Sequence, residues 1–252
     1  MPNVDILFEE QLTKKSISFK KQDKNLYLVH TNGTDKTVSL ENLEKNFIRD
    51  QDLNLVETFI ASIIQPIENL PKWSELKKGI FVSIEPSDYD LEQKIHKKLS
   101  KSAIAILSYY NNDTNQVRWL SKADLVERDI NIEKAWSQGY DNLENILAKS
   151  KVSYADIEGE KIGMLEVDEP YKASLILTKG LKVKVLKHIG WPIYAVAPAR
   201  DFVYIFSKDG GVINKVGSVV TKEYSQSAYP ISTEVWELSD SMPKAIGAFP
   251  IE

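Results

Sequence analysis

Cysteine is absent from this 252-residue sequence, and histidine occurs only three times. Without cysteine the chain cannot form disulfide bonds, thiolate metal sites or a cysteine nucleophile. The histidines, His30, His96 and His188, are widely separated, and no two of them have the spacing that places metal ligands on one face of a helix. We therefore expect neither a bound metal nor another cofactor.

Long apolar runs are also missing, since no segment approaches the roughly 20 apolar residues that a membrane-spanning helix needs. Residues 1–10 contain no lysine or arginine, whereas a secretory signal begins with a positively charged region. A basic excess is absent too, because 32 Lys and Arg residues are set against 36 Asp and Glu residues, for a net charge of −4. These features predict a cytoplasmic protein that binds neither membranes nor nucleic acid.

The residues that are present predict a folded chain, with 42% hydrophobic and 10% aromatic residues. The predicted strands and helices cluster instead of alternating strictly, which is typical of the α+β class with antiparallel strands and packed helices. A polar turn at 111–115 favours two small α+β units, residues 1–112 and residues 113–252. The length also allows one large, continuous domain.

Hydrophobic periodicity and turn residues predict the order of the elements. Residues 1–128 are expected to form a helix at 4–12, an antiparallel meander ending with strands 26–29 and 37–40, a helix from 43 to 64, and strands 80–84, 103–109 and 116–120. The rest is expected to form a helix at 129–149, a strand at 162–167, a helix at 170–178, paired strands at 193–197 and 202–206, a helix at 212–226, and strands at 235–238 and 245–249. Ser121 is expected to cap a helix.

Two segments carry a family resemblance. They are the run from Tyr194 to Asp201, with the sequence Tyr-Ala-Val-Ala-Pro-Ala-Arg-Asp, and the run Tyr229-Pro230-Ile231-Ser232. Together with the order of the elements, they make the sequence resemble the YtpQ-like family of bacterial proteins, whose function is unknown. The resemblance implies a bacterial cytoplasmic α+β protein and implies no catalytic residues.

Asp209, Gly210 and Gly211 stand between a predicted strand and a predicted helix. This context is the right one for an anion bound at the N-terminus of a helix. However, the surrounding sequence matches neither the Gly-x-Gly-x-x-Gly pattern nor a P-loop. A turn that needs glycine at positive φ is therefore the favoured explanation.

Two further charged groups each allow two explanations. Asp168 and Glu169 precede Pro170, so they either begin a helix or join other carboxylates in acid–base chemistry. The other carboxylates near them fall in an expected polar loop, at 156, 158 and 160. The alternation of residues 181–185 places Lys182 and Lys184 on one face if this segment is a strand. That face either meets an acidic partner or protects a sheet edge from aggregation.

Arg200 and Asp201 lie in the predicted turn between two strongly apolar strands. A turn does not need arginine, whose planar guanidinium suits a carboxylate or phosphate. Either the turn recognises a partner, or Arg200 forms an internal ion pair that anchors the hairpin to the end of a helix.

Two functions remain open at this stage. The first is a non-catalytic binding or interaction protein of the accessory or immunity type, with another protein as its partner. The second is a hydrolase-like enzyme that uses carboxylates and a hydroxyl in a cleft of the C-terminal half. The polar residues expected around such a cleft are Asp168, Glu169, Arg200, Asp201 and Ser232. The enzyme requires several of these residues to converge, whereas the binding protein does not.

Overall fold

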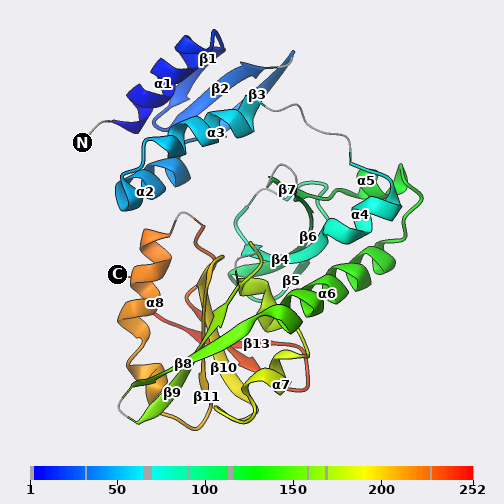
Figure 1. Cartoon of the computed structure of the whole chain (residues 1–252), viewed down its shortest axis with the longest axis vertical. Helices are drawn as coiled ribbons and strands as arrows, with labels where there is room; N and C mark the ends of the chain where they lie inside the picture. Colours follow the sequence, from blue (N-terminus) through cyan, green and yellow to red (C-terminus); the bar gives the residue numbers. More distant parts are fainter. Residues whose placement is uncertain are drawn as a thin grey trace. The chain divides into compact units, whose positions relative to one another are not determined.

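The computed structural model describes residues 3–31, 33–64, 70–89, 91–112, 116–157, 159–167, 170–227 and 229–251. The fold is α+β, and the described residues form three antiparallel sheets (Figure 1). Two compact units divide the chain. The first comprises Met1–Asn69 with Gln226–Ala228, and the second comprises Leu70–Ser225 with Tyr229–Glu252.

The first unit is a three-stranded meander, in the order β1-β2-β3, with helices on one face. Its elements are α1 (Val4–Lys14), β1 (Ser18–Asp23), β2 (Leu26–Thr31), β3 (Thr34–Ser39), α2 (Glu41–Asp50) and α3 (Asn54–Ile64). Tyr27 and Val29 alternate with outward-facing residues on β2 and are fully buried against Phe8 and Leu12 of α1. The meander and the first helix confirm the pattern predicted from the sequence.

The single helix expected from 43 to 64 is instead two helices. Gln51 ends α2 in the left-handed conformation, with φ of 52°. The side chain of Asp52 then accepts a hydrogen bond from the backbone N–H of Asn54 at 2.9 Å, where α3 begins. Apolar residues keep a helical spacing through this region, so periodicity alone does not reveal the break.

The second unit begins with a small sheet and its helices. The strands are β4 (Ile80–Pro86), β5 (His96–Lys98), β6 (Ala103–Asn111) and β7 (Gln116–Trp119), and the helices are α4 (Trp73–Gly79), α5 (Lys122–Val126) and α6 (Ile132–Lys149). Ser121 caps α5 as predicted, in a reciprocal box with Asp124. Gly139 lets α6 lie close to β4, because a Cβ at that position would be 3.1 Å from Val82 Cγ2.

The rest of the second unit is built on a six-stranded sheet in the order β13-β12-β10-β11-β9-β8. The strands are β8 (Lys151–Ile157), β9 (Glu160–Glu166), β10 (Ile193–Ala199), β11 (Phe202–Ser207), β12 (Glu234–Leu238) and β13 (Lys244–Ala248). The helices between them are η1 (Ala173–Leu177), α7 (Leu181–Val185), η2 (Val212–Asn214) and α8 (Gly217–Gln226).

The two faces of this sheet bury separate clusters. On β10, Ile193 and Ala195 join the large core of the unit, whereas Tyr194 and Val196 face the cluster around η2 and α8. The sheet is therefore covered on both faces, which fits the apolar runs of its central strands.

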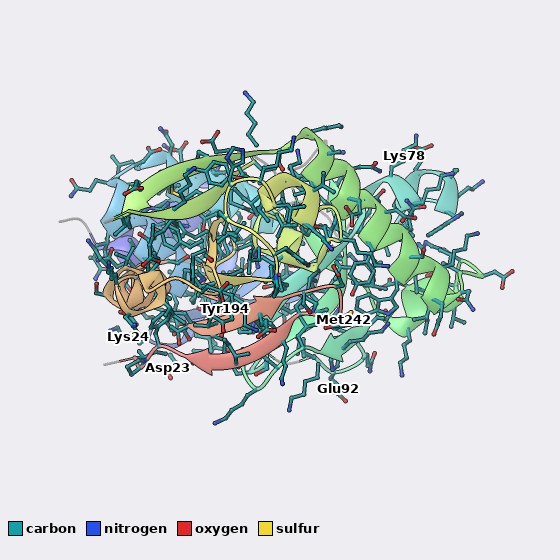
Figure 2. The ribbon with its side chains drawn as sticks, turned by 90° about the horizontal axis from the view of Figure 1, so that it is seen from below. Asp23, Lys24, Lys78, Glu92, Tyr194 and Met242 are labelled. Atoms are coloured by element: carbon teal, nitrogen blue, oxygen red, sulfur yellow. The ribbon has the colours of Figure 1, made fainter. Side chains whose placement is uncertain are left out.

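Charged residues at the surface of the unit point outward from the ribbon, as Lys78 of α4 does (Figure 2).

The structure corrects the expected boundary between residues 112 and 113. β6 and β7 pair with each other in one sheet, with Tyr109 opposite Arg118. The strands on either side of that boundary therefore belong to one sheet, and the two compact units divide instead between Asn69 and Leu70.

Three local predictions for the last third are also corrected. Residues 181–185 form the helix α7 and not a strand, because Leu181 and Val185 are buried four residues apart while Val183 is 80% exposed. Asp156 and Glu160, which were expected in a loop, instead lie in the paired strands β8 and β9, and residue 158 lies outside the described residues. The helices expected at 212–226 and 170–178 are η2 followed by α8, and the short 3₁₀ helix η1.

Candidate binding site

Three serines and a glutamate form a polar cluster in the second unit, in which Ser232 and Glu234 are buried and Ser100 and Ser102 are half-buried. Ser100 and Ser102 lie just before β6, Ser232 lies just before β12, and Glu234 is the first residue of β12. The hydroxyls of Ser102 and Ser232 are 2.8 Å apart. Glu234 Oε2 accepts hydrogen bonds from Ser100 and Ser232. The Ser102–Ser232 and Ser100–Glu234 bonds join residues 130 and 134 positions apart in the sequence and connect the two sheets of the unit.

The cluster forms part of the wall of a hollow of about 450 Å³. Polar residues on this wall are Ser87, Asp88, Lys101, Ser102, Ser232, Thr233 and Glu234. Apolar residues on it are Pro86, Tyr224, Ile231, Ala248, Phe249 and Ile251. The volume lies within the ~300–1,000 Å³ range of ligand sites, and a mixed lining can fix both the position and the orientation of a bound group.

The carboxylate of Glu234 is only partly satisfied. Glu234 is 8% exposed, and both of its hydrogen bonds end on Oε2. In the part of the chain that the structure describes, Oε1 has no hydrogen-bond partner and Glu234 has no ion-pair partner. Oε1 is not fully buried, so it keeps some contact with solvent. The hollow therefore offers a negatively charged acceptor.

A second buried glutamate lies directly before the residues that line the hollow. Glu85 is 1% exposed and accepts hydrogen bonds from Arg200 Nη2 at both carboxylate oxygens, at 3.1 and 2.9 Å. The hydroxyl of Ser83 donates to Glu85 Oε1 at 2.6 Å. This ion pair is the internal one considered for Arg200 from the sequence, but its partner is on β4 and not at the end of a helix.

Backbone hydrogen bonds hold the Arg200 turn in place. The N–H of Arg200 donates to the carbonyl of Tyr229, and the carbonyl of Arg200 accepts from the N–H of Ala173. The guanidinium lies over the Tyr229 ring, 4.5 Å from its centroid. Burial is the largest effect and acts to lower the pKa of Arg200, but the charge and hydrogen bonds of Glu85, with smaller contributions from Tyr229 and Tyr89, together outweigh it, so the pKa lies above its ordinary value. Arg200 is thus charged and fixed.

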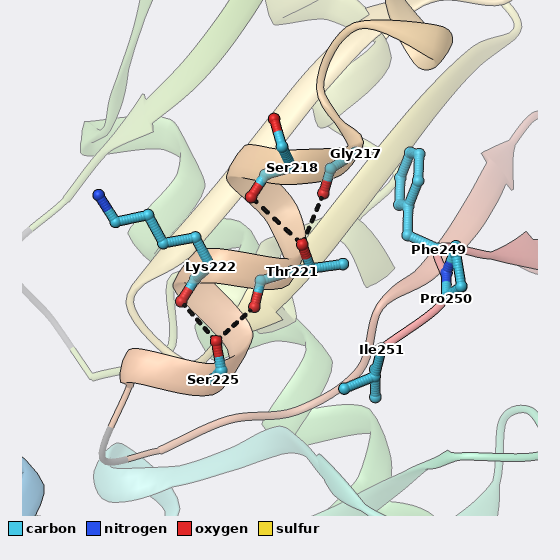
Figure 3. A pocket seen from close by; sticks show the side chains of 8 residues that line it. All are labelled: Gly217, Ser218, Thr221, Lys222, Ser225, Phe249, Pro250 and Ile251. Atoms are coloured by element: carbon cyan, nitrogen blue, oxygen red, sulfur yellow. Dashed lines mark hydrogen bonds between the residues drawn. The ribbon is translucent and has the colours of Figure 1, made fainter.

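Two more hollows adjoin the first along α8 and the C-terminal segment. One, of about 580 Å³, is lined by Gly217, Ser218, Thr221, Lys222, Ser225, Phe249, Pro250 and Ile251 (Figure 3). Another, of about 400 Å³, is lined by Ile213, Asn214, Gly217, Val235, Ile246, Gly247, Ala248 and Phe249. Phe249 belongs to the walls of all three, so the hollows are neighbours on one surface.

The structure separates the residues proposed from the sequence. Ser232 lines the polar hollow, and Arg200 is paired with Glu85. Asp201 is exposed in the turn. Asp168 and Glu169 lie outside the described residues. Of the three proposed residues that the structure describes, only Ser232 lines the polar hollow, so these residues do not converge on one cleft as the enzyme hypothesis requires.

Lys182 and Lys184 do not share a face, because α7 is a helix. Lys182 Nζ pairs with Asp240 at 2.8 Å and lies over the Trp191 ring. Lys184 Nζ donates to the carbonyls of Ala148 and Ser150 at the end of α6. Both lysines have partners within the chain, so the structure does not assemble the basic face that the alternation predicted.

Gly210 and Gly211 lie beside an anion, but the anion is a side chain of the protein. Glu160 accepts hydrogen bonds from the N–H groups of Gly211 and Val212 at 2.8 and 3.0 Å. A Cβ on Gly210 would lie next to Glu160 Oε2. Neither glycine is among the residues with positive φ. The predicted reason for these glycines is therefore wrong: they make room for the Glu160 carboxylate.

Sequence reasoning missed Glu85, Glu234 and Ser102. The two glutamates could have been found because each is a carboxylate next to an apolar strand segment. Glu85 follows Ile80–Ile84, and Glu234 precedes Val235 and Trp236. Among the described residues, no three His, Asp or Glu side chains converge as a metal site requires. No described helix combines the length and apolarity needed to cross a membrane.

Comparisons of this chain with protein-family models, with curated proteins and with solved structures find no match. The resemblance to the YtpQ-like family therefore stays a prediction.

Proposed function

We propose that this chain is a non-catalytic binding protein that holds another protein at the polar hollow and at the two hollows beside it. The observation that carries the proposal is the shared wall residue Phe249, which makes three separate depressions neighbours on one surface. A row of hollows suits a partner that presents several side chains in succession. A single small molecule would occupy only one of them.

The edge of the six-stranded sheet supports a protein partner. β13 is an edge strand, and four of its five residues are exposed. Ile246, Gly247 and Ala248 of this strand line one of the hollows. An extended segment of another protein can pair with such an edge while its alternate side chains enter adjacent pockets. A protein of this kind acts by occupying its partner, as accessory and immunity proteins do.

Variants at the rim of the polar hollow test this proposal without disturbing the core. Lys101 lines the hollow and is exposed, so Lys101→Trp should cover the opening and leave the fold intact. Lys122→Trp is the matched control, because Lys122 is exposed but lines none of the three hollows. A partner isolated from the native cell would be purified, and its affinity would be measured by calorimetry.

We expect Lys101→Trp to weaken binding roughly tenfold or more, the effect of losing about 1.4 kcal/mol, and Lys122→Trp to leave it unchanged. Equal affinities for both variants would place the partner elsewhere and contradict the proposal.

The hydrolase alternative is kept as a second candidate because of one contact. Ser232 Oγ lies 3.3 Å from Glu234 Oε2, the arrangement of a hydroxyl nucleophile beside a carboxylate base. Hydrolysis of a chromogenic ester panel by the wild type, lost in both Ser232→Ala and Glu234→Gln, would favour the enzyme. Equal background rates for the wild type and these variants would remove it.

A further inference from the structure

The second unit contains two buried glutamates with different surroundings. Glu85 and Glu234 are 1% and 8% exposed. Glu85 is neutralised by the guanidinium of Arg200 at 2.9 Å. Glu234 has no cationic partner within the described residues, although it lines an open hollow. The fold therefore supplies the counter-charge for one carboxylate and leaves the other without one.

This difference has an energetic consequence. An ionised carboxylate removed from water is destabilising unless hydrogen bonds or a cation compensate for the lost hydration. Ser100 and Ser232 supply hydrogen bonds to Oε2 only. A cation that reached Oε1 from the hollow would compensate the second carboxylate oxygen, and it would gain a charge-assisted hydrogen bond in a site of low exposure.

We infer that the polar hollow binds a protonated primary amine carried on an aliphatic chain, with the ammonium group at Glu234 Oε1. The inference rests on the proposed function, in which the amine is a lysine side chain of the partner protein. An ammonium has three donors and no acceptor. The Ser102 and Ser232 hydroxyls, 2.8 Å apart, stand beside Glu234 as further acceptors.

The rest of the hollow fits the aliphatic chain. Tyr224, Ile231 and Phe249 form apolar parts of its wall, and long charged side chains commonly bury their methylene groups in this way. The other charged groups of the wall are Asp88 and Lys101, both exposed. Asp88 adds attraction for a bound cation. Lys101 makes no ion pair with Glu234, and its positive charge opposes the binding of a cation. Of the charged groups on this wall, the buried one is the carboxylate of Glu234.

Amide chemical shifts of the full chain would be followed during titration with four probes. Two are n-butylammonium and its neutral counterpart n-butanol. The other two are a terminally blocked alanine pentapeptide with a central lysine and the same peptide with Nε-acetyl-lysine. We expect n-butylammonium and the lysine peptide to shift the amides of Ser102, Ser232 and Glu234 with saturation, at dissociation constants on the order of millimolar. The neutral probes should leave these amides unshifted.

Glu234→Gln keeps the shape of the side chain and removes its charge, and it should weaken n-butylammonium binding roughly tenfold or more. Glu237→Gln is the matched control on the same strand, since Glu237 pairs with Lys208 and does not line the hollow. Equal binding of n-butanol, or unchanged binding by Glu234→Gln, would overturn the inference.

The remaining outcomes separate the inference from the function on which it rests. If n-butylammonium binds and the lysine peptide does not, the site takes free amines, so the amine inference holds and the protein-binding function loses support. If no amine binds while Lys101→Trp still weakens partner binding, the binding function holds and the amine inference is wrong.

Discussion

Arg200 Nη2 contacts both carboxylate oxygens of Glu85, a residue 115 positions away in the sequence. The pair joins the turn after β10 in the six-stranded sheet to the end of β4 in the smaller sheet. The side chain of Glu85 is 2% exposed and that of Arg200 is 21% exposed. Removal of either partner therefore leaves a buried charge uncompensated.

Arg200→Ala should destabilise the second unit by about 3 kcal/mol, because loss of one member of a buried pair leaves the other unpaired. For a unit of this size, that change lowers the melting temperature by roughly 10 °C. Asp201→Ala, at the exposed neighbouring position, should leave the melting temperature within about 1 °C of the wild type. Thermal unfolding followed by circular dichroism provides the measurement.

The double variant Glu85→Leu with Arg200→Met tests the same pair from the other side. Replacement of both charges by apolar groups should recover most of the stability lost in the single variants. If Arg200→Ala instead keeps the wild-type melting temperature but loses partner binding, Arg200 is a recognition residue and the structural interpretation of the pair is wrong.

Gly210→Ala should destabilise the protein by about 1–2 kcal/mol, because the new methyl group displaces the Glu160 carboxylate from the N–H groups of Gly211 and Val212. The clash is with the end of a flexible side chain, so the lost hydrogen bonds dominate. In a Glu160→Ala background the same substitution should cost much less. A double-mutant cycle from urea unfolding measures this coupling, and additive effects would show that the glycine is required for another reason.

The first unit should lose stability in strongly alkaline solution through Tyr27. Burial, together with the hydrogen bond to Glu9, raises the pKa of the Tyr27 hydroxyl to about 12. The unfolded side chain ionises with a pKa near 10. The unfolded state therefore releases the proton first, so this contribution to stability is complete below about pH 10 and is lost as the pH rises towards 12.

Absorbance at 295 nm reports this ionisation directly. The difference between titrations of the wild type and Tyr27→Phe isolates one residue, since Tyr27 is the only tyrosine in residues 1–69. We expect the difference to have a midpoint close to 12. A midpoint near 10 would show that the hydroxyl is solvated and that its bond to Glu9 is not formed.

Local patterns were sufficient to predict much of the fold. The meander, the hairpin of β10 and β11, and the cap at Ser121 were all readable, because turn residues and alternating apolar residues act between near neighbours in the sequence. The short helix α7 was not readable, since Leu181, Val183 and Val185 match both a strand and a single helical turn. Only burial of the first and last of these residues, against the core of the unit, decides between the two.

The candidate site depends on contacts that no local pattern contains. Ser102 and Ser232 meet across 130 positions because the two sheets of the second unit pack against each other. Ser232 was found from the sequence, but its partners Ser102 and Glu234 were not. In the same way, the arginine of the turn was recognised as unusual, while its partner Glu85 could be identified only once the sheets were in place.

The most direct test of the account is hydrogen exchange, followed by mass spectrometry, of the chain alone and in its purified complex with the partner. The binding surface proposed here predicts that the complex slows exchange together in three segments around the hollows, residues 100–103, 230–234 and 246–251. Exchange in β8, at the opposite edge of the sheet, should stay unchanged. Protection confined to β8 or to other elements, with these three segments unaltered, would contradict the account.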